Sequence, residues 1–275
     1  MIAQNFEYAA PTSLKEALSQ LDAGGKILAG GMSLIPLMKL RLAAPERLVD
    51  LRKVPGLAGI RVDGGTIRIG AMTTHYEIES SPLLRDKCPL LAETAAHIGD
   101  VQVRNMGTIG GSVAHADPAA DYPAALLALE ARVRIVSSKG ERTVPFDGFI
   151  IDTLTTALEP GDLVAEVVVN HEEQAVGTSY QKMLQPASGF AIVGVAARAR
   201  KGFARIGVTG LASKQFRATK AEQIFAATGD VRKASAAVAE DVDANSDLHA
   251  SADYRRHLAA VYTARALNQA LSRAS

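Results

Sequence analysis

Leu28-Ala-Gly-Gly-Met-Ser-Leu34 and Gly107-Thr-Ile-Gly-Gly-Ser112 are the two stretches from which the fold of this chain is best inferred. Each places two consecutive glycines in apolar sequence, with a serine close behind. Consecutive glycines let the backbone turn sharply and let N–H groups converge without obstructing side chains. Neutral donors of this kind, with a hydroxyl beside them, suit the oxygen atoms of a diphosphate. The pattern therefore predicts a phosphate-bearing ligand held between two loops.

Glycine pairs also make ordinary turns, and Gly24-Gly25 and Gly64-Gly65 are expected to do only that. Two further pairs in apolar surroundings favour a ligand over the simple turn. Neither of them belongs to the G-x-G-x-x-G fingerprint of dinucleotide-binding folds or to the G-K-[ST] of a P-loop. On the residues alone, both interpretations stay open.

The composition excludes several classes of protein. The chain has 275 residues, 48% of them hydrophobic, which is enough for one sizeable core or two modest ones. Lys and Arg number 30 against 29 Asp and Glu, so nothing in the charge favours binding to nucleic acid or to an anionic membrane. Cys88 is the only cysteine, and one thiol cannot supply the ligands of an iron–sulfur cluster or a structural zinc.

The location of the protein is predicted from what the sequence lacks. The first residues, MIAQNFEYAAP, do not resemble a secretory signal, and no apolar run approaches the roughly 20 residues that span a bilayer. We therefore expect a cytoplasmic protein without a transmembrane segment.

Two charged residues outside the glycine stretches are candidates for ligand binding. Asp117-Pro118 is typical of an N-cap followed by proline at the first helical position, which predicts a helix over residues 119–129. Asp121 is then either a favourable acid in the first turn or an acceptor for the hydroxyls of a sugar or ribityl chain. Lys182, before a strand that begins near Phe190, is either a surface cation or a ligand-binding group.

Metal and hydrolase chemistry find no support in the sequence. His115 has no second His or Cys at metal-ligand spacing, so we assign no metal. Ser33 and Ser112 lack a paired His and acid, which argues against a hydrolase.

The order of expected elements indicates an α+β protein in two parts. A β-α-β unit fills the first fifty residues, starting from a capping box at Ser13–Glu16. Hairpins and helices follow up to about residue 172. The sequence after residue 172 predicts a hairpin over residues 190–210 and then helices at 219–228, 231–241 and 253–271.

Longer stretches around these motifs resemble a known family. Ala29–Arg41 and Arg104–Asp121 are similar to the medium subunit of aerobic carbon monoxide dehydrogenases, and more widely to the FAD-binding subunits and domains of xanthine dehydrogenase-type molybdenum hydroxylases. Tyr180-x-Lys182 with Phe190–Val193 looks like the family's linker, and Ser251–Leu258 like its last helix. The four motifs occur in the family's order, and the resemblance covers nearly the whole chain.

The resemblance implies a fold and domain boundaries. Residues 1–172 would form a two-part FAD-binding domain of the vanillyl-alcohol-oxidase (PCMH) type, with subdomains at about 1–55 and 56–172. Residues 173–275 would form a C-terminal α+β flavoprotein domain, a small antiparallel sheet with helices.

The resemblance also implies which residues hold the cofactor, a non-covalent FAD. The diphosphate would lie between the two glycine stretches, Asp121 would meet the polyol of the flavin, and Lys182 would lie near the isoalloxazine. Phe190 and Met32 depart from the Tyr and His of carbon monoxide dehydrogenases, which weighs against carbon monoxide as the substrate. The full set comprises Ile27, Leu28, Ala29, Gly30, Gly31, Met32, Ser33, Leu34, Ile98, Thr108, Ile109, Gly110, Gly111, Ser112, Asp121, Val164, Lys182 and Phe190.

The function that follows is electron transfer rather than substrate hydroxylation. Molybdopterin would lie on a large partner subunit and iron–sulfur clusters on a small one, in a hetero-oligomer such as a dimer of heterotrimers. The FAD would pass electrons from the clusters to an external acceptor. Two alternatives stay open: a self-sufficient FAD-dependent oxidase or reductase of the same superfold, and a flavin-free assembly protein.

Overall fold

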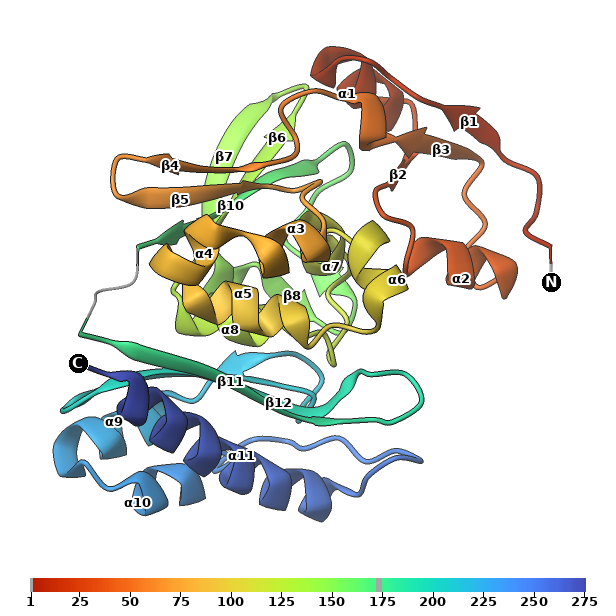
Figure 1. Cartoon of the computed structure of the whole chain (residues 1–275). Coiled ribbons are helices and arrows are strands. Elements are labelled where there is room, and N and C mark those ends of the chain that lie inside the picture. The colour runs from red at the N-terminus through yellow and green to blue at the C-terminus, as the bar shows by residue number, and fades with distance from the viewer. Residues whose placement is uncertain (1, 172–174) are drawn as a thin grey trace.

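The computed structural model describes residues 2–171 and 175–275. The predicted domain boundary at residues 172 and 173 thus lies outside the described residues. Figure 1 shows the chain as successive layers: a small N-terminal unit, an antiparallel sheet, a layer of helices, a second sheet and a final layer of helices.

The N-terminal unit is the β-α-β arrangement that the sequence predicts. Its three strands are parallel, in the order β1-β3-β2. The Ser13 hydroxyl accepts a hydrogen bond from Glu16 N, but the Glu16 carboxylate accepts from Thr12 N rather than from Ser13 N. The elements are β1 Glu7–Ala9, α1 Leu14–Asp22, β2 Lys26–Leu28, α2 Leu34–Lys39, β3 Arg47–Asp50 and the short η1 Leu51–Lys53.

A five-stranded antiparallel sheet in the order β4-β5-β10-β6-β7 follows, with helices covering one face. Its strands are β4 Ile60–Asp63, β5 Thr66–Gly70, β6 Arg132–Ser137, β7 Gly140–Pro145 and β10 Leu163–Asn170. The other elements are α3 His75–Ser80, α4 Pro82–Lys87, α5 Pro89–Ala96, α6 Val101–Met106, α7 Ile109–His115, α8 Tyr122–Ala128, η2 Phe146–Gly148, β8 Ile150–Asp152 and β9 Thr155–Thr156.

Strand β10 is buried on both faces, and this joins the N-terminal unit to the sheet. Val167 and Val169 belong to the core formed with the helical layer. Leu163 and Ala165 pack instead with Leu21 and other apolar residues of the N-terminal unit. Successive apolar side chains of β10 point to opposite faces of the sheet, and they therefore pack the first fifty residues against the rest of the chain.

The C-terminal sheet lies between two helical layers. Its order is β11-β12-β13-β14, with α5 and α8 on one face and the C-terminal helices on the other. Burial on both faces explains the nearly continuous apolar sequence of β12. The elements are β11 Gly177–Leu184, β12 Ala191–Arg200, β13 Phe203–Thr209, β14 Phe216–Arg217, α9 Thr219–Thr228, α10 Val231–Ala236 and α11 Ala252–Arg273.

Three sequence-based expectations need correction. The helix predicted from residue 119 begins only at Tyr122, because the Asp117 carboxylate accepts from Ala119 N and closes a turn. The helix predicted for residues 231–241 ends at Ala236. The second glycine pair lies in the first turn of α7 rather than in a loop.

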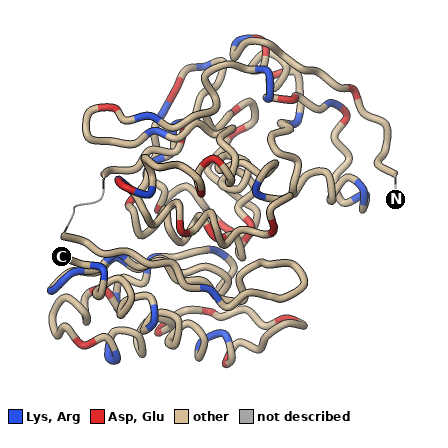
Figure 2. Tube along the Cα trace, in the orientation of Figure 1, with Lys and Arg blue, Asp and Glu red and all other residues tan. Residues whose placement is uncertain are grey.

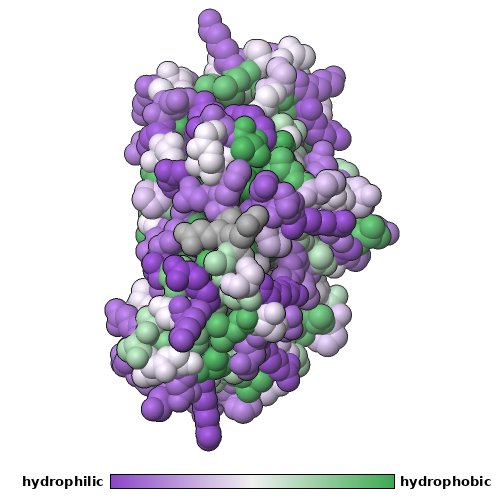
Figure 3. All heavy atoms as spheres, turned by 60° about the vertical axis from the view of Figure 1, so that its left-hand side comes forward, coloured by the Kyte–Doolittle hydropathy of each residue, from purple (hydrophilic) through white to green (hydrophobic). Residues whose placement is uncertain are grey.

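Charged and apolar residues are mixed over the surface. Figure 2 shows basic and acidic residues interspersed along both halves of the chain, and on the face in Figure 3 apolar residues form small groups among hydrophilic ones. No helix among residues 2–171 and 175–275 combines the length and hydropathy of a membrane span.

Candidate functional site

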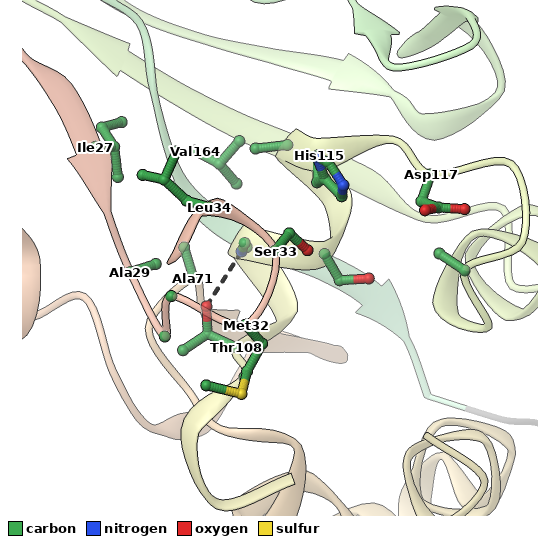
Figure 4. A pocket seen from close by; sticks show the side chains of 18 of the residues that line it. Ile27, Ala29, Met32, Ser33, Leu34, Ala71, Thr108, His115, Asp117 and Val164 are labelled. Atoms are coloured by element: carbon green, nitrogen blue, oxygen red, sulfur yellow. Dashed lines mark hydrogen bonds between the residues drawn. The ribbon is translucent and has the colours of Figure 1, made fainter. Parts of the chain in front are cut away.

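A cavity of about 830 Å³ lies where the N-terminal unit, α7 and the C-terminal part meet. Its walls include residues 29–34, termed here the first glycine segment, and residues of 107–112, the second glycine segment. In Figure 4, Ala29 and Ser33 of the first segment and Thr108 of the second converge on one space. The size is typical of a site for a cofactor-sized ligand.

The first glycine segment offers backbone donors to the cavity. Gly31 has φ +77°, a conformation that glycine adopts without strain, and its carbonyl accepts from Ile35 N to start α2. Among the described residues, no protein acceptor binds the N–H groups of residues 30–33. The Ser33 hydroxyl makes no cap bond to the helix that it precedes. These donors remain available to a ligand.

The second glycine segment differs, because most of its N–H groups are used within the protein. Ile109 N donates to Thr73 O at 3.1 Å and Gly110 N to Ala71 O at 2.9 Å. Gly111 N donates to Thr108 Oγ1 at 3.1 Å. The second segment therefore lines the cavity with glycines and offers the Ser112 hydroxyl rather than a set of backbone donors.

Two of the glycines permit the close packing that brings the segments together. A Cβ on Gly30 would lie 1.9 Å from Met106 O, and a Cβ on Gly110 would lie 2.4 Å from Ala71 Cβ. Both contacts involve groups that cannot swing aside. Gly111 is more open, since its Cβ would meet only Thr108 Oγ1 at 3.0 Å and Ala29 Cβ at 3.6 Å.

Asp121 lies at the other end of the cavity in a buried ionic cluster. Its carboxylate accepts from the Tyr180 hydroxyl and lies 3.0 Å from Lys182 Nζ. Burial raises the pKa of Asp121 to about 6, while Lys182 and Tyr180 act in the opposite direction. Asp121 is therefore mostly ionised at neutral pH, and it faces a ligand as an acceptor. Gly194 makes room for this cluster, because a Cβ there would lie 2.4 Å from the Tyr180 hydroxyl.

Lys182 is neither of the two things that the sequence left open. Its side chain is 1% exposed, and its ammonium also donates to His97 O and Gly189 O. With three partners in the protein, Lys182 holds Asp121 and two nearby turns in place rather than reaching a ligand itself.

Most of the predicted cofactor residues line the cavity. Leu28, Ile109 and Lys182 do not: Leu28 lies in β2, Ile109 is fully buried in the core, and Lys182 lies behind Asp121. The predicted residues that do line it are Ile27, Ala29, Gly30, Gly31, Met32, Ser33, Leu34, Ile98, Thr108, Gly110, Gly111, Ser112, Asp121, Val164 and Phe190.

The sequence interpretation missed two parts of the wall. His75 lines the cavity, is 4% exposed, and its Nδ1 has no partner among the described residues. Burial, with the charge of Arg104, lowers the pKa of His75 to about 4, so its imidazole is neutral. His75 follows Thr74, which forms a capping box with Glu77. This sequence pattern could have indicated that His75 is held at the start of a helix. Residues 154–156 and 158–163 also line the cavity, although no site residue is predicted among them.

Among residues 2–171 and 175–275, no three His, Cys, Asp or Glu side chains gather in a way that could hold a metal ion.

Two family models match consecutive parts of the chain. Residues 4–170 match the FAD binding domain in molybdopterin dehydrogenase, and residues 178–270 match the CO dehydrogenase flavoprotein C-terminal domain. The chain belongs to the FAD-binding medium subunits of the carbon monoxide dehydrogenase and xanthine dehydrogenase family. It is thus a flavoprotein subunit of an oxidoreductase complex, and the predicted family, fold class and FAD cofactor are confirmed.

Several relatives match over nearly their full length. The carbon monoxide dehydrogenase medium chain of Hydrogenophaga pseudoflava is 40% identical, with 99% of each chain covered. The 6-hydroxypseudooxynicotine dehydrogenase complex subunit alpha of Paenarthrobacter nicotinovorans is 38% identical, covering 98% of this chain and 96% of the relative. Quinoline 2-oxidoreductase from Pseudomonas putida 86 has a chain with a TM-score of 0.92 at 33% identity, and 98% of each chain is covered.

Proposed function

We propose that the cavity binds FAD non-covalently and that this chain relays electrons from a partner's iron–sulfur clusters to an external acceptor. The observation that carries the proposal is the row of N–H groups at residues 30–33, which have no acceptor in the described part of the chain and belong to a segment that lines the cavity with the Ser33 hydroxyl. Converging neutral donors of this kind fit a diphosphate. Bound there, the FAD supplies the redox chemistry.

The two ends of the cavity differ in a way that orients the cofactor. One end is formed by Leu21, Lys26 and residues 159–163, and we assign it to the adenosine. The opposite end has Asp121, Ile98 and Phe190, and we assign it to the flavin ring and its polyol. The Asp121 carboxylate accepts hydrogen bonds from hydroxyl groups, and the apolar side chains suit the ring.

Exposed apolar side chains around the flavin end support partner docking. Phe190 is 45% exposed and Met32 38% exposed, although both line the cavity. The neighbouring elements add Ile35, Val101, Met106 and Leu184. Exposed apolar groups with polar surroundings are typical of protein interfaces. We assign this surface to the small iron–sulfur subunit, within a hetero-oligomer that also contains the large molybdopterin subunit.

The relatives support placing substrate specificity on another subunit. Their names refer to carbon monoxide, 6-hydroxypseudooxynicotine and quinoline, yet each matches this chain over at least 96% of its length. One flavoprotein architecture serving such different substrates fits an electron carrier better than a substrate-binding enzyme.

Anaerobic flavin reduction tests the relay. The isolated chain should be yellow and reducible by dithionite, but inert toward aldehydes, N-heterocycles and carbon monoxide. With its iron–sulfur and molybdopterin subunits, the substrate of the complex should bleach the flavin. Rapid reduction of the isolated chain by one of these substrates would instead show a self-sufficient oxidase, and a colourless chain that ignores added FAD would contradict the cofactor site. Acid precipitation should release all of the flavin as FAD, and flavin left in the pellet would show a covalent bond.

A further inference from the structure

The turn at residues 117–121 lines the flavin end of the cavity, but the C-terminal domain holds it in shape. Thr209, at the end of β13, is 1% exposed, and its hydroxyl lies 2.9 Å from Pro118 O and 2.7 Å from Ala120 O. A hydroxyl has one hydrogen, so the two carbonyls share it. Gly210 N donates to Pro118 O as well.

The two remaining carbonyls of the turn have partners from the same domain. Gln215 Nε2 donates to Asp117 O at 2.6 Å, and Ala191 N donates to Ala119 O at 3.3 Å. Four consecutive carbonyls, at residues 117–120, thus accept hydrogen bonds from β12, β13 and the segment that follows β13. These external partners fix the conformation of the turn together with its own hydrogen bonds, from Ala119 N to the Asp117 carboxylate and from Ala120 N to Asp117 O.

The next residue, Asp121, is held in the same way by its side chain. Tyr180 and Lys182, both on β11, bind its carboxylate. Close packing fixes the turn further, because a Cβ on Gly207 of β13 would lie 2.0 Å from Ala124 O in α8. The C-terminal sheet therefore touches the turn and the start of α8 without an intervening layer.

We propose that the C-terminal domain shapes the flavin end of the cofactor site through this turn, with Thr209 as the central positioning residue. The proposal rests on the FAD site proposed above. Thr209 does not line the cavity and acts only through residues 118 and 120. Docking of the C-terminal domain and binding of FAD are then linked: each favours the other by the same factor.

Thr209→Val tests the proposal, because valine has the shape of threonine without the hydroxyl. The buried Ala120 O then loses the hydroxyl that donates to it, while Pro118 O keeps only Gly210 N, and affinity for FAD should fall about tenfold. Thr209→Ser keeps the hydroxyl and should stay within about twofold of the wild type. Thr263 supplies a matched control, since it is 0% exposed and its hydroxyl has no partner among the described residues. Thr263→Val should leave the affinity unchanged.

Flavin fluorescence is the appropriate probe, because the chain contains no Trp whose emission could report binding. Apoprotein of each variant is titrated with FAD, and separately with ADP by calorimetry. ADP occupies only the adenosine end and the diphosphate site, so its affinity should be the same in Thr209→Val and the wild type. This comparison separates a local effect on the turn from a general loosening of the fold.

The outcomes separate the two proposals. Equal losses of FAD and ADP affinity in Thr209→Val, or FAD affinity within twofold of the wild type, would overturn the role of Thr209. An equal loss in Thr209→Ser would also overturn it, because the hydroxyl would then not be the cause. A wild-type chain that binds ADP and FAD equally weakly would contradict the FAD site itself.

Discussion

Replacing Gly111 with alanine should weaken FAD binding while leaving the apoprotein as stable as the wild type. Gly111 lies in the first turn of α7 on the cavity wall, and its φ is not in the left-handed region. An added Cβ would meet Thr108 Oγ1 at 3.0 Å and Ala29 Cβ, in the first glycine segment, at 3.6 Å. The methyl group therefore narrows the cavity where the two glycine segments approach each other.

The expected magnitudes follow from these distances. In the apoprotein the close Thr108 contact needs a shift of a few tenths of an ångström, and alanine gains up to about 1 kcal/mol over glycine in a helix. These effects nearly cancel. A ligand that contacts this part of the wall must shift to make room for the added methyl group. Overpacking of that kind costs about 1–3 kcal/mol. FAD affinity should accordingly fall by about tenfold to a hundredfold.

Fluorescence titration and urea denaturation of the apoprotein measure the two effects. Gly30→Ala is the control, because its Cβ would lie 1.9 Å from Met106 O, a backbone atom. This variant should lose both stability and FAD binding. A Gly111→Ala variant with wild-type affinity would refute the assignment of the space beside α7 to the cofactor. A large loss of apoprotein stability would refute the packing argument.

Two further predictions concern buried groups. In the folded chain the pKa of His75 is lowered to about 4. Below about pH 6.5 the unfolded chain therefore binds a proton that the folded chain does not bind. The contribution of His75 to stability is then full above pH 6.5 and is lost as the pH falls. Between pH 7.5 and 5, the wild type should lose about 2 kcal/mol more than His75→Gln in urea denaturation, and equal losses in the two proteins would contradict the assignment. Gly194→Ala should weaken FAD binding about tenfold, because its Cβ would displace the Tyr180 hydroxyl from Asp121. Adding Tyr180→Phe should cause little further loss of affinity, whereas fully additive losses in a double-mutant cycle would show that the two residues act independently.

Local sequence was sufficient for some elements and not for others. The helix at Thr219–Thr228 and the hairpin around Gly64 follow from periodicity and turn residues, since both depend on neighbours in sequence. The helix predicted from residue 119 starts too early, because Thr209 and Gln215, which bind the preceding turn, come about 90 residues later. The sequence does not predict strand β11, because its buried residues include the polar Thr178 and Ser179 and show no apolar alternation.

The cofactor site, too, is predicted only in part by local sequence. Glycine pairs located both segments, but sequence could not tell which N–H groups the protein itself would use. That depended on Ala71 and Thr73, which accept from α7 through tertiary contacts. The resemblance places Lys182 near the isoalloxazine, whereas its burial against Asp121 depends on the packing of β11.

The position of α8 between the two sheets affects how the protein is made. All seven residues of α8 are buried, and β12 and β13 cover one of its faces. On a translating ribosome, that face stays open to water until residues 191–209 have emerged from the exit tunnel. The segment up to residue 170 therefore cannot complete its core as an independent unit during synthesis, and it presents apolar surface to chaperones throughout that interval.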